Sequence, residues 1–530
     1  MENFEKEKIL NRFNKLIDIS LALSLEKKYY NLIEKILFGA KELTHSDGGT
    51  LYTRTEEDTL KFEIIQTDSL NLHKGGSANL PIDLLEVPLY DKRNAPNEKM
   101  VSAYSAVREK TVLIEDAYDV DTFDFSGTRL FDKMMGYRSK SFMTVPMKNH
   151  EGKVIGVLQL INALDDKTGE VISFSSDDVI FVESLASLAA VAMTKQNLIH
   201  NLNQMLESFV QAIADAIDKK SPHTGHHCRR VPILAMMLAQ AVNDSKKGKF
   251  KKFFFSEDEF SELFFASWMH DCGKISIPTR LVEKKTKLET VFDRIELLDT
   301  RFEAMRRQEE VKFLKKKAEF TDPQSLRDLE ESFGEKLKKW EEDRKFLHFC
   351  NQSKEKILSD EDLQRIERIS HYQWVDIKGV SKPFLSLEEV ENLSIKKGTL
   401  TNKEIEAMRE HVALTNEMLS KIPYPKRIRR VSEIASSHHE SLDGSGYPKK
   451  LKGEEISFQA RILCIADIFE ALTASERPYK KSMKLSEAYA ILKRLGKEKK
   501  LDSDLLDLFF DSKVVFQYAK QYLSPEQIDL

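Results

Sequence analysis

The chain is poor in cysteine. Four cysteines are spread over 530 residues, and no two of them form a Cys-x-x-Cys pair. A disulfide scaffold needs many paired cysteines, and thiolate zinc sites use closely spaced ones. The sequence therefore excludes both arrangements and indicates thiols that stay reduced.

The chain also shows no long apolar run, no signal-peptide pattern in its first residues and no excess of charge. No uncharged apolar stretch approaches the about 20 residues of a membrane-spanning helix, and the N-terminus is charged from Glu2 onward, unlike a signal peptide. The 82 basic and 86 acidic residues give a net charge of −4, so composition offers no electrostatic case for binding DNA. We expect a soluble cytoplasmic protein that binds neither DNA nor a membrane.

The length is too great for one ordinary domain. At about 100–200 residues per domain, 530 residues predict two or three domains. Hydrophobic residues make up 41% of the chain, which is enough to bury sizeable cores, and the 32% of charged residues indicates exposed helices.

The N-terminal part combines helices and strands. Apolar residues recur at helical spacing over residues 1–45 and again from Ser176 to about Lys220. Asp47-Gly48-Gly49 ends the first helical stretch. The predicted strands cover residues 50–52, 60–65, 111–114, 141–146 and 154–161. Strands bracketed by helices predict an α+β domain of about 190 residues.

After Pro222 the pattern becomes all-helical. Helical spacing covers residues 260–271, 402–421, 428–439, 459–474 and 485–495. Between about residues 284 and 400 the chain is dense in charged residues, and two long helices are predicted over 288–320 and 326–350. A solvated antiparallel helical arm is the simpler interpretation of this segment, and a partner-binding arm is the alternative.

Histidine is concentrated in the second half of the chain. Of the 13 histidines, seven lie in four clusters, which are His223 with His226 and His227, then His270, then His411, and finally His438 with His439.

The pair His270 and Asp271 stands at the end of an apolar helix. Imidazole and carboxylate together suit iron, manganese, cobalt, nickel or zinc, and a carboxylate can bridge two ions. Lys274 would share the face of His270 if the helix continued, and its charge could then hold a phosphate oxygen. A His-Asp pair is also common by chance, so this motif alone does not establish a metal site.

The second cluster pairs His438 with His439 just before a loop over residues 443–448. Adjacent histidines can reach two different ions, and the glycines of this loop leave Tyr447 open to a ligand. A helix cap followed by a surface turn is an equal alternative. Asp467 lies on an otherwise apolar helix, where an unpaired carboxylate costs several kcal/mol, so it is either a ligand or a paired core residue.

Together these positions form a set of nitrogen and oxygen donors without cysteine. The set has six or seven members, more than one tetrahedral zinc ion takes. Two or three metals that share ligands fit better, and iron, manganese or cobalt suits such sites better than zinc. Ions about 3.5–4 Å apart are typical of phosphoester hydrolysis. The donors are His227, His270, Asp271, His411, His438, His439 and Asp467.

The motifs in this order resemble the HD-GYP subfamily of HD-domain phosphohydrolases. The resemblance runs from about Asp218 to Leu495, interrupted by the charged segment. It implies an all-helical phosphodiesterase that hydrolyses cyclic di-GMP to pGpG and often on to GMP, with two or three divalent ions that are often iron. The motifs are His-Thr-Gly-x-His at 223–227, His-Asp-x-Gly-Lys at 270–274, His411, His-His-Glu at 438–440, Asp-Gly-x-Gly-Tyr-Pro at 443–448, and Asp467 followed by Arg-Pro-Tyr at 477–479.

The resemblance also implies roles for single residues. The seven donors would be metal ligands, with Asp271 bridging two ions and acting in catalysis. Lys274 would contact the scissile phosphate, and Tyr447 would belong to the loop that binds substrate. We expect iron first and manganese as the alternative.

Four further residues receive roles in the same way. Arg477, with Lys480 or Lys481, would bind phosphate or guanine. His223 stands where some members of the subfamily carry a glutamate that supports a third metal. Because His223 could either ligate a metal or face solvent, the number of metals, two or three, stays open.

The N-terminal part resembles a GAF domain over about residues 25–195. The resemblance rests on Phe131–Ser141, Val145–Met147 and Val154–Asn162. GAF domains are sensory α+β modules that often dimerise, and some bind cyclic nucleotides through a motif that begins Asn-Lys. Here Asn162 is followed by alanine, which argues against a cyclic nucleotide as ligand. Another small-molecule ligand and a purely dimerising role are both open.

These expectations combine into one architecture. We predict an N-terminal helix at residues 1–24, a GAF-like domain at 25–195, a connecting helix at 196–222, and an HD-GYP domain at 223–530 with its helical insertion at about 284–400. The predicted protein is a homodimeric, metal-dependent phosphodiesterase for cyclic di-GMP that the GAF domain regulates. The alternatives are a catalytically weak cyclic-dinucleotide receptor and a hydrolase of another cyclic dinucleotide such as cyclic GMP-AMP.

Overall fold

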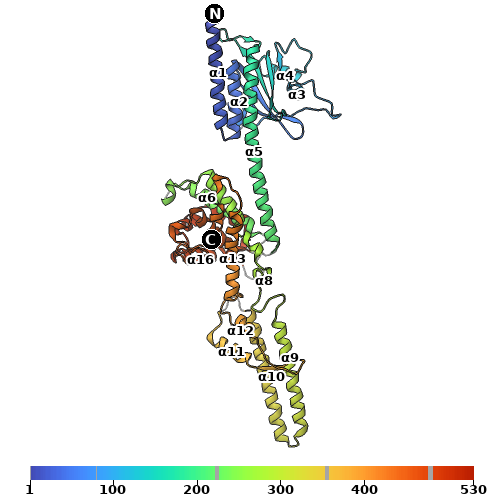
Figure 1. The fold of residues 1–530 in the computed structure, drawn as a ribbon, viewed down its shortest axis with the longest axis vertical. Helices are drawn as coiled ribbons and strands as arrows, with labels where there is room; N and C mark the ends of the chain where they lie inside the picture. Colours follow the sequence, from blue (N-terminus) through green and yellow to red (C-terminus); the bar gives the residue numbers. More distant parts are fainter. Residues whose placement is uncertain (1, 79, 221–225, 247, 353–356, 475–481) are drawn as a thin grey trace. The chain divides into compact units, whose positions relative to one another are not determined.

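The chain divides into two compact units. The computed structural model describes residues 2–78, 80–220, 226–246, 248–352, 357–474 and 482–530 (Figure 1). The first unit spans Met1–Met205 and the second spans Leu206–Leu530. The predicted order, an α+β part followed by a largely helical part, is confirmed.

The N-terminal unit is built on an antiparallel sheet with the order β3-β2-β1-β7-β6-β5, in which β4 pairs with β2 and β8 with β7. All five predicted strands form, whereas β3, β4 and β8 are too short to show an alternating pattern. The strands are β1 (Ser46–Arg54), β2 (Thr59–Thr67), β3 (Leu72–Gly75), β4 (Val87–Pro88), β5 (Val112–Ile114), β6 (Phe142–Lys148), β7 (Val154–Leu164) and β8 (Val171–Ile172).

Three helices cover one face of this sheet. Leu16 of α1, Ile36 of α2 and Leu185 of α5 belong to one buried cluster with strand residues such as Leu51 and Leu158. The helix α3 packs on β6 and β7. The helices of this unit are α1 (Glu2–Leu25), α2 (Tyr29–Thr44), α3 (Val101–Arg108), α4 (Ser126–Met135) and the start of α5 (Ser176–Lys220).

The helical stretch predicted over residues 1–45 forms as two helices, α1 and α2, rather than as one continuous helix. The carboxylate of Glu26 accepts hydrogen bonds from the backbone N–H groups of Lys27 and Lys28, both at 3.0 Å. Such local side-chain-to-backbone bonds compete with helical ones. The break lets α2 pack against α1, and the predicted helix from Ser176 to Lys220 is confirmed as α5.

The C-terminal unit packs its helices around α15, whose Ile462, Leu463, Ala466 and Phe469 are fully buried. Their neighbours in the same core come from α6, α7 and the end of α5. The helices of this core are α6 (His227–Asp244), α7 (Glu257–Met269), α8 (Thr279–Val282), α13 (Asn402–Ser420), α14 (Val431–Ala435), α15 (Phe458–Thr473), α16 (Leu485–Lys497), α17 (Ser503–Asp511) and α18 (Val514–Tyr522).

The helix predicted over residues 428–439 is much shorter than expected. Only α14 is α-helical, and a 3₁₀ turn precedes it. The hydroxyls of Ser436 and Ser437 donate to the carbonyl oxygen of Glu433, at 3.3 and 2.8 Å. Serines that bond to nearby carbonyls weaken a helix, so the chain turns at this point and presents His438 and His439 from a loop.

The charged insertion is more than a solvated hairpin. Its two long helices form as predicted, with the rings of Phe313 and Phe333 stacked between them. Residues after 357 add a small core in which Ile366 and Phe384 pack against Phe302. The elements are α9 (Ile295–Glu319), α10 (Pro323–Gln352), α11 (Asp360–Ser370), β9 (Gln373–Val375), β10 (Ser381–Pro383) and α12 (Leu387–Leu393).

The base of the insertion is fastened to α13. The buried amino group of Lys284 donates to Asn392 at 2.8 Å and to both carboxylate oxygens of Glu404, at 2.9 and 2.8 Å. Because Glu404 lies in the first turn of α13, the insertion starts and ends beside the helix that carries His411.

Candidate metal centre

Five elements of the C-terminal unit bring the predicted donors together. His227 is the first residue of α6, Asp467 lies in the middle of α15, and His411 lies in the middle of α13. His270 and Asp271 follow the end of α7, and the histidine pair at 438–439 follows α14. Donors that are up to 240 positions apart in sequence therefore meet in the core of one unit.

Asp271 lies at the centre of this group. The Nε2 atoms of His270 and His227 lie 3.3 and 3.6 Å from its Oδ2 atom. Those of His411 and His438 lie 3.5 and 3.9 Å from its Oδ1 atom. One carboxylate thus faces two pairs of imidazoles, which is the geometry of a ligand that bridges two ions.

The two remaining predicted donors complete the group. The Oδ1 atom of Asp467 lies 3.1 Å from Nε2 of His227 and 3.8 Å from Nε2 of His270. The ring of His439 lies 4.1 Å, centre to centre, from that of His438. Donor atoms of His411, His438 and His439 all lie within 4.8 Å of one another, as do those of His227, His270 and Asp271.

Backbone carbonyls orient three of the imidazoles. The Nδ1 atoms of His270, His411 and His438 each contact the carbonyl oxygen three residues earlier, at 2.7, 2.6 and 2.6 Å. A carbonyl oxygen only accepts, so each Nδ1 carries the proton and donates it. In a neutral ring Nε2 then keeps its lone pair, and that atom is aimed at Asp271.

The facing atoms lack hydrogen-bond partners. Nε2 of His270, His411 and His438 and Oδ1 of Asp271 are buried, and none of them has a hydrogen bond within the described part of the chain. Two acceptors that face each other at such distances repel, and a buried polar atom without a partner costs about 1–3 kcal/mol. A divalent cation between them removes both penalties, so these residues fit a metal centre.

The charge states of the group also suit cation binding. Burial raises the pKa of Asp271, but the charge of the neighbouring Lys274 holds it well below its ordinary value. Burial lowers the pKa of His411, takes that of His438 well below its ordinary value, and lowers that of His439 to about 4. At neutral pH these rings are uncharged and the carboxylate is ionised, as metal ligands must be.

His227 differs from the other histidines because a second carboxylate touches it. Burial lowers its pKa, but Glu470 and Asp467 together raise it to about 10. The Nδ1 atom of His227 contacts the buried carboxylate of Glu470, which comes one helical turn after Asp467 on α15. Sequence reasoning missed Glu470, although a second carboxylate on an apolar helix was a signal for it.

Lys274 extends into the site from a 3₁₀ turn, which the sequence did not predict. The α-helix ends at Met269, and a 3₁₀ turn, η4 (Cys272–Ser276), follows, so Lys274 does not share a helical face with His270. Its Nζ atom still lies 2.5 Å from Oδ2 of Asp271. Burial lowers the pKa of Lys274, but Asp271 raises it above its ordinary value, so a fixed cation stands at the centre.

Close packing between η4 and α13 sets the distance from His411 to Asp271. A Cβ atom on Gly273 would lie 2.0 Å from the carbonyl oxygen of His411 and 2.7 Å from the backbone nitrogen of Thr415. The hydroxyl of Thr415 accepts a hydrogen bond from the backbone N–H of Gly273 at 2.9 Å and donates to the carbonyl of His270 at 3.1 Å. Thr415 was not predicted to matter, since a lone threonine in a helix carries no signal.

The loop over residues 443–448 folds over His439. The ring of Tyr447 stacks on that of His439 at 4.9 Å, and the guanidinium of Arg409 lies 5.0 Å from the centre of the Tyr447 ring. Glu440 holds the loop by accepting from the backbone N–H of Lys449 at 2.7 Å and from that of residue 451 at 3.0 Å. Tyr447 thus stands at the edge of the donor group, beside His439.

Four predicted site residues lie outside the described residues. They are His223, Arg477, Lys480 and Lys481.

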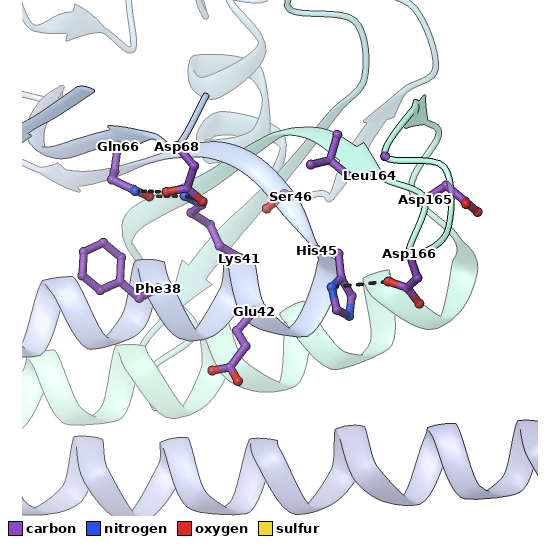
Figure 2. A pocket seen from close by; sticks show the side chains of 11 residues that line it. Phe38, Lys41, Glu42, His45, Ser46, Gln66, Asp68, Leu164, Asp165 and Asp166 are labelled. Atoms are coloured by element: carbon purple, nitrogen blue, oxygen red, sulfur yellow. Dashed lines mark hydrogen bonds and ion pairs between the residues drawn. The ribbon is translucent and has the colours of Figure 1, made fainter. Parts of the chain in front are cut away.

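The N-terminal unit has a hollow of about 670 Å³ at the end of α2 (Figure 2). Lys41 lies in it, 2.9 Å from Asp68, and Nδ1 of His45 lies 3.3 Å from Asp166. These side chains contact one another, so the hollow by itself does not identify a ligand. Within the described ranges, no helix combines the length and the apolarity that crossing a membrane requires.

Two family models match the chain. The GAF domain model matches residues 31–193, and the HD domain model matches residues 388–505. The HD match contains His411, His438, His439 and Asp467. The other three donors, His227, His270 and Asp271, precede this match, because the helical insertion separates the two groups in sequence. The fold brings the two groups together.

Several curated proteins are similar to parts of this chain. The 3'3'-cGAMP-specific phosphodiesterase 3 of Vibrio cholerae serotype O1 is 38% identical over 135 residues, 26% of this chain and 26% of that protein. A probable cyclic di-GMP phosphodiesterase of the same organism is 35% identical over 142 residues, 26% of this chain and 32% of that protein. The cyclic di-GMP phosphodiesterase of Thermotoga maritima is 39% identical over 106 residues, 20% of this chain and 28% of that protein.

The matched stretches span only about a quarter to a third of these relatives. The likeness therefore concerns part of this chain and not whole proteins. The two family matches show that the chain contains a GAF domain followed by an HD domain.

Proposed function

We propose that this chain is a metal-dependent phosphodiesterase that hydrolyses a cyclic dinucleotide, with cyclic di-GMP as the first candidate substrate. One observation carries the proposal: the buried Nε2 atoms of His411 and His438 face Oδ1 of Asp271, and none of these three atoms has a hydrogen-bond partner among the described residues. The cyclic-dinucleotide phosphodiesterases that are similar to part of this chain support the choice of substrate class.

Seven side chains would hold the metals. Asp271 would bridge two ions. The donors on one side of it are His227, His270 and Asp467, and those on the other are His411, His438 and His439. Oxygen and imidazole donors without thiolate favour iron, with manganese as the alternative. When bound, paired divalent ions supply activation of water and polarisation of the phosphate oxygens.

The chain's own residues then position the substrate. Lys274 is a partly exposed cation beside Asp271, suited to hold a phosphate oxygen as negative charge develops on it. Tyr447 offers an aromatic face at the edge of the group, suited to a guanine base. Glu470 keeps His227 turned so that its Nε2 faces both aspartates.

The test begins with anaerobic purification, counting of bound metals and an assay of cyclic di-GMP hydrolysis in Fe(II) or Mn(II). We expect about two or three ions per chain, because the donors can hold that many ions when some ligands are shared. We also expect hydrolysis of cyclic di-GMP to pGpG or GMP. Asp271→Asn should lose both metal and activity. His200→Gln, at an exposed histidine of α5, is the control and should change neither. Full hydrolysis by Asp271→Asn would refute the proposal.

A second substrate is favoured by one comparison. The relative with 38% identity is named as specific for 3'3'-cGAMP. Measuring kcat/KM for cyclic di-GMP and 3'3'-cGAMP in the same preparation decides between them. Bound nucleotide without turnover in the metal-loaded protein would instead support a receptor.

We also propose that the protein is a homodimer that the GAF domain regulates. On α5, Leu198, Leu202 and Met205 are 54, 59 and 66% exposed and follow one another at spacings of four and three residues. Such spacing is typical of a helix that pairs with another helix. Leu202→Glu should then yield monomers in sedimentation experiments, and an unchanged dimer would contradict this interface.

A further inference from the structure

The last residue of α5 contacts the turn that carries Lys274. The amino group of Lys220 donates to the carbonyl oxygen of Ile277 at 2.9 Å and to that of Ile275, and it lies 3.5 Å from that of Lys274. These carbonyls belong to η4 and the residue that follows it. The C-terminal end of a helical turn exposes such carbonyls, and a lysine cation there is favourable.

The other side of the same turn is held by α13. The backbone N–H of Gly273 donates to Thr415 at 2.9 Å, and the missing side chain lets it lie against the carbonyl of His411. Lys274 is the next residue, and its carbonyl oxygen is the first of the three that the amino group of Lys220 contacts. The residue that contacts Asp271 therefore lies between an attachment to α13 and an attachment to α5.

The part of the turn that Lys220 holds has little packing of its own. The side chain of Ile275 is 42% exposed, whereas Cys272 before it is fully buried and Ile277 after it is 3% exposed. A segment with few buried contacts moves easily unless polar contacts fix it. The amino group of Lys220 bonds across this exposed stretch.

We propose that Lys220 is a positioning residue, which sets the place of Lys274 beside Asp271 by fixing the turn to the end of α5. The inference rests on the proposed phosphodiesterase function, in which Lys274 holds a phosphate oxygen. Because α5 is one continuous helix from Ser176 to Lys220, a change in its C-terminal turn reaches Lys274 through this contact.

The experiment compares three variants of the full-length, metal-loaded protein. Lys220→Met removes the charge but keeps the aliphatic stem, and Lys220→Arg keeps a cation. Lys219→Met is the matched control, since Lys219 is exposed on the same last turn. The readouts are hydrogen exchange of the peptide over residues 273–278, metal content, and kcat and KM for cyclic di-GMP.

We expect Lys220→Met to speed exchange in that peptide and to lower kcat by about tenfold, as a slightly misplaced group does. Its metal content should be unchanged, because no ligand is altered. Lys220→Arg should restore most of kcat, and Lys219→Met should resemble the parent. Unchanged exchange and kcat in Lys220→Met, or a loss confined to thermal stability, would overturn the inference.

The two proposals fail in different ways. If the metal-loaded parent hydrolyses no cyclic dinucleotide, the proposed function fails. In that case, faster hydrogen exchange over residues 273–278 in Lys220→Met, and not in the other variants, would still show that Lys220 positions the turn. Equal exchange in all variants would refute the positioning role of Lys220.

Discussion

Replacing Gly273 with alanine tests the packing that holds His411 against the His270–Asp271 pair. The added Cβ would lie 2.0 Å from the carbonyl oxygen of His411. A carbon and a carbonyl oxygen need about 3.3 Å, so α13 or η4 must move by about 1.3 Å. Metal–ligand distances tolerate only about 0.2 Å. We expect activity to fall by about a hundredfold and stability by about 1–3 kcal/mol.

The assay is metal content by mass spectrometry together with hydrolysis and urea unfolding. Gly273→Ala should remain folded by circular dichroism and should lose metal, because His411 no longer reaches its place. Gly334→Ala is the control, since a Cβ at Gly334 in α10 meets nothing within 4 Å. It should be neutral or stabilise the helix by up to about 1 kcal/mol. A Gly273→Ala protein with full metal content and full activity would refute the packing argument.

Three further predictions concern pH, the substrate loop and the insertion. Without metal, burial lowers the pKa of His227 but Glu470 and Asp467 raise it to about 10, so metal must displace a proton. Metal affinity, measured by competition with a chelator, should therefore rise from pH 7 toward 10. The stability that the ion pairs of His227 lend the metal-free fold is lost as pH rises through about 10. A metal affinity that does not depend on pH would contradict this prediction. Tyr447→Ala should raise KM by about three- to tenfold while Tyr447→Phe changes it little, since the ring itself makes the stacking contact, and equal KM values would exclude that role. Lys284→Met should lower the free energy of unfolding in urea by about 2 kcal/mol, because it leaves Glu404 without its buried partner. The same substitution at the exposed neighbour Lys285 is the control, and equal effects at both positions would argue against the Lys284–Glu404 contact as a source of stability.

Much of the candidate site was predictable because its residue types are costly in a core. A carboxylate such as Asp467 on an apolar helix requires a partner, and adjacent histidines such as His438 and His439 are unusual there. Helical periodicity likewise predicted α5 and α15 closely. Residues whose role depends on a neighbour in space carried no such signal, as with Thr415 and Lys220.

The local errors have a common cause. The break after α1 and the short α14 both arise where a side chain bonds to nearby backbone, at Glu26 and at Ser437. Periodicity counts apolar residues and is blind to such bonds. The small core of the insertion was missed for a related reason, since its apolar residues, such as Phe384, are thinly spread among charged ones.

The sequence by itself determined the two-part architecture, and it predicted the set of nitrogen and oxygen donors. These follow from composition and periodicity, which act on each segment separately. Only the tertiary structure decided that one carboxylate, Asp271, faces four imidazoles, that Glu470 turns His227, and that Lys220 and α13 hold the turn of Lys274 from two sides. Such contacts join segments far apart in the chain, and their distances depend on how whole helices pack rather than on local sequence.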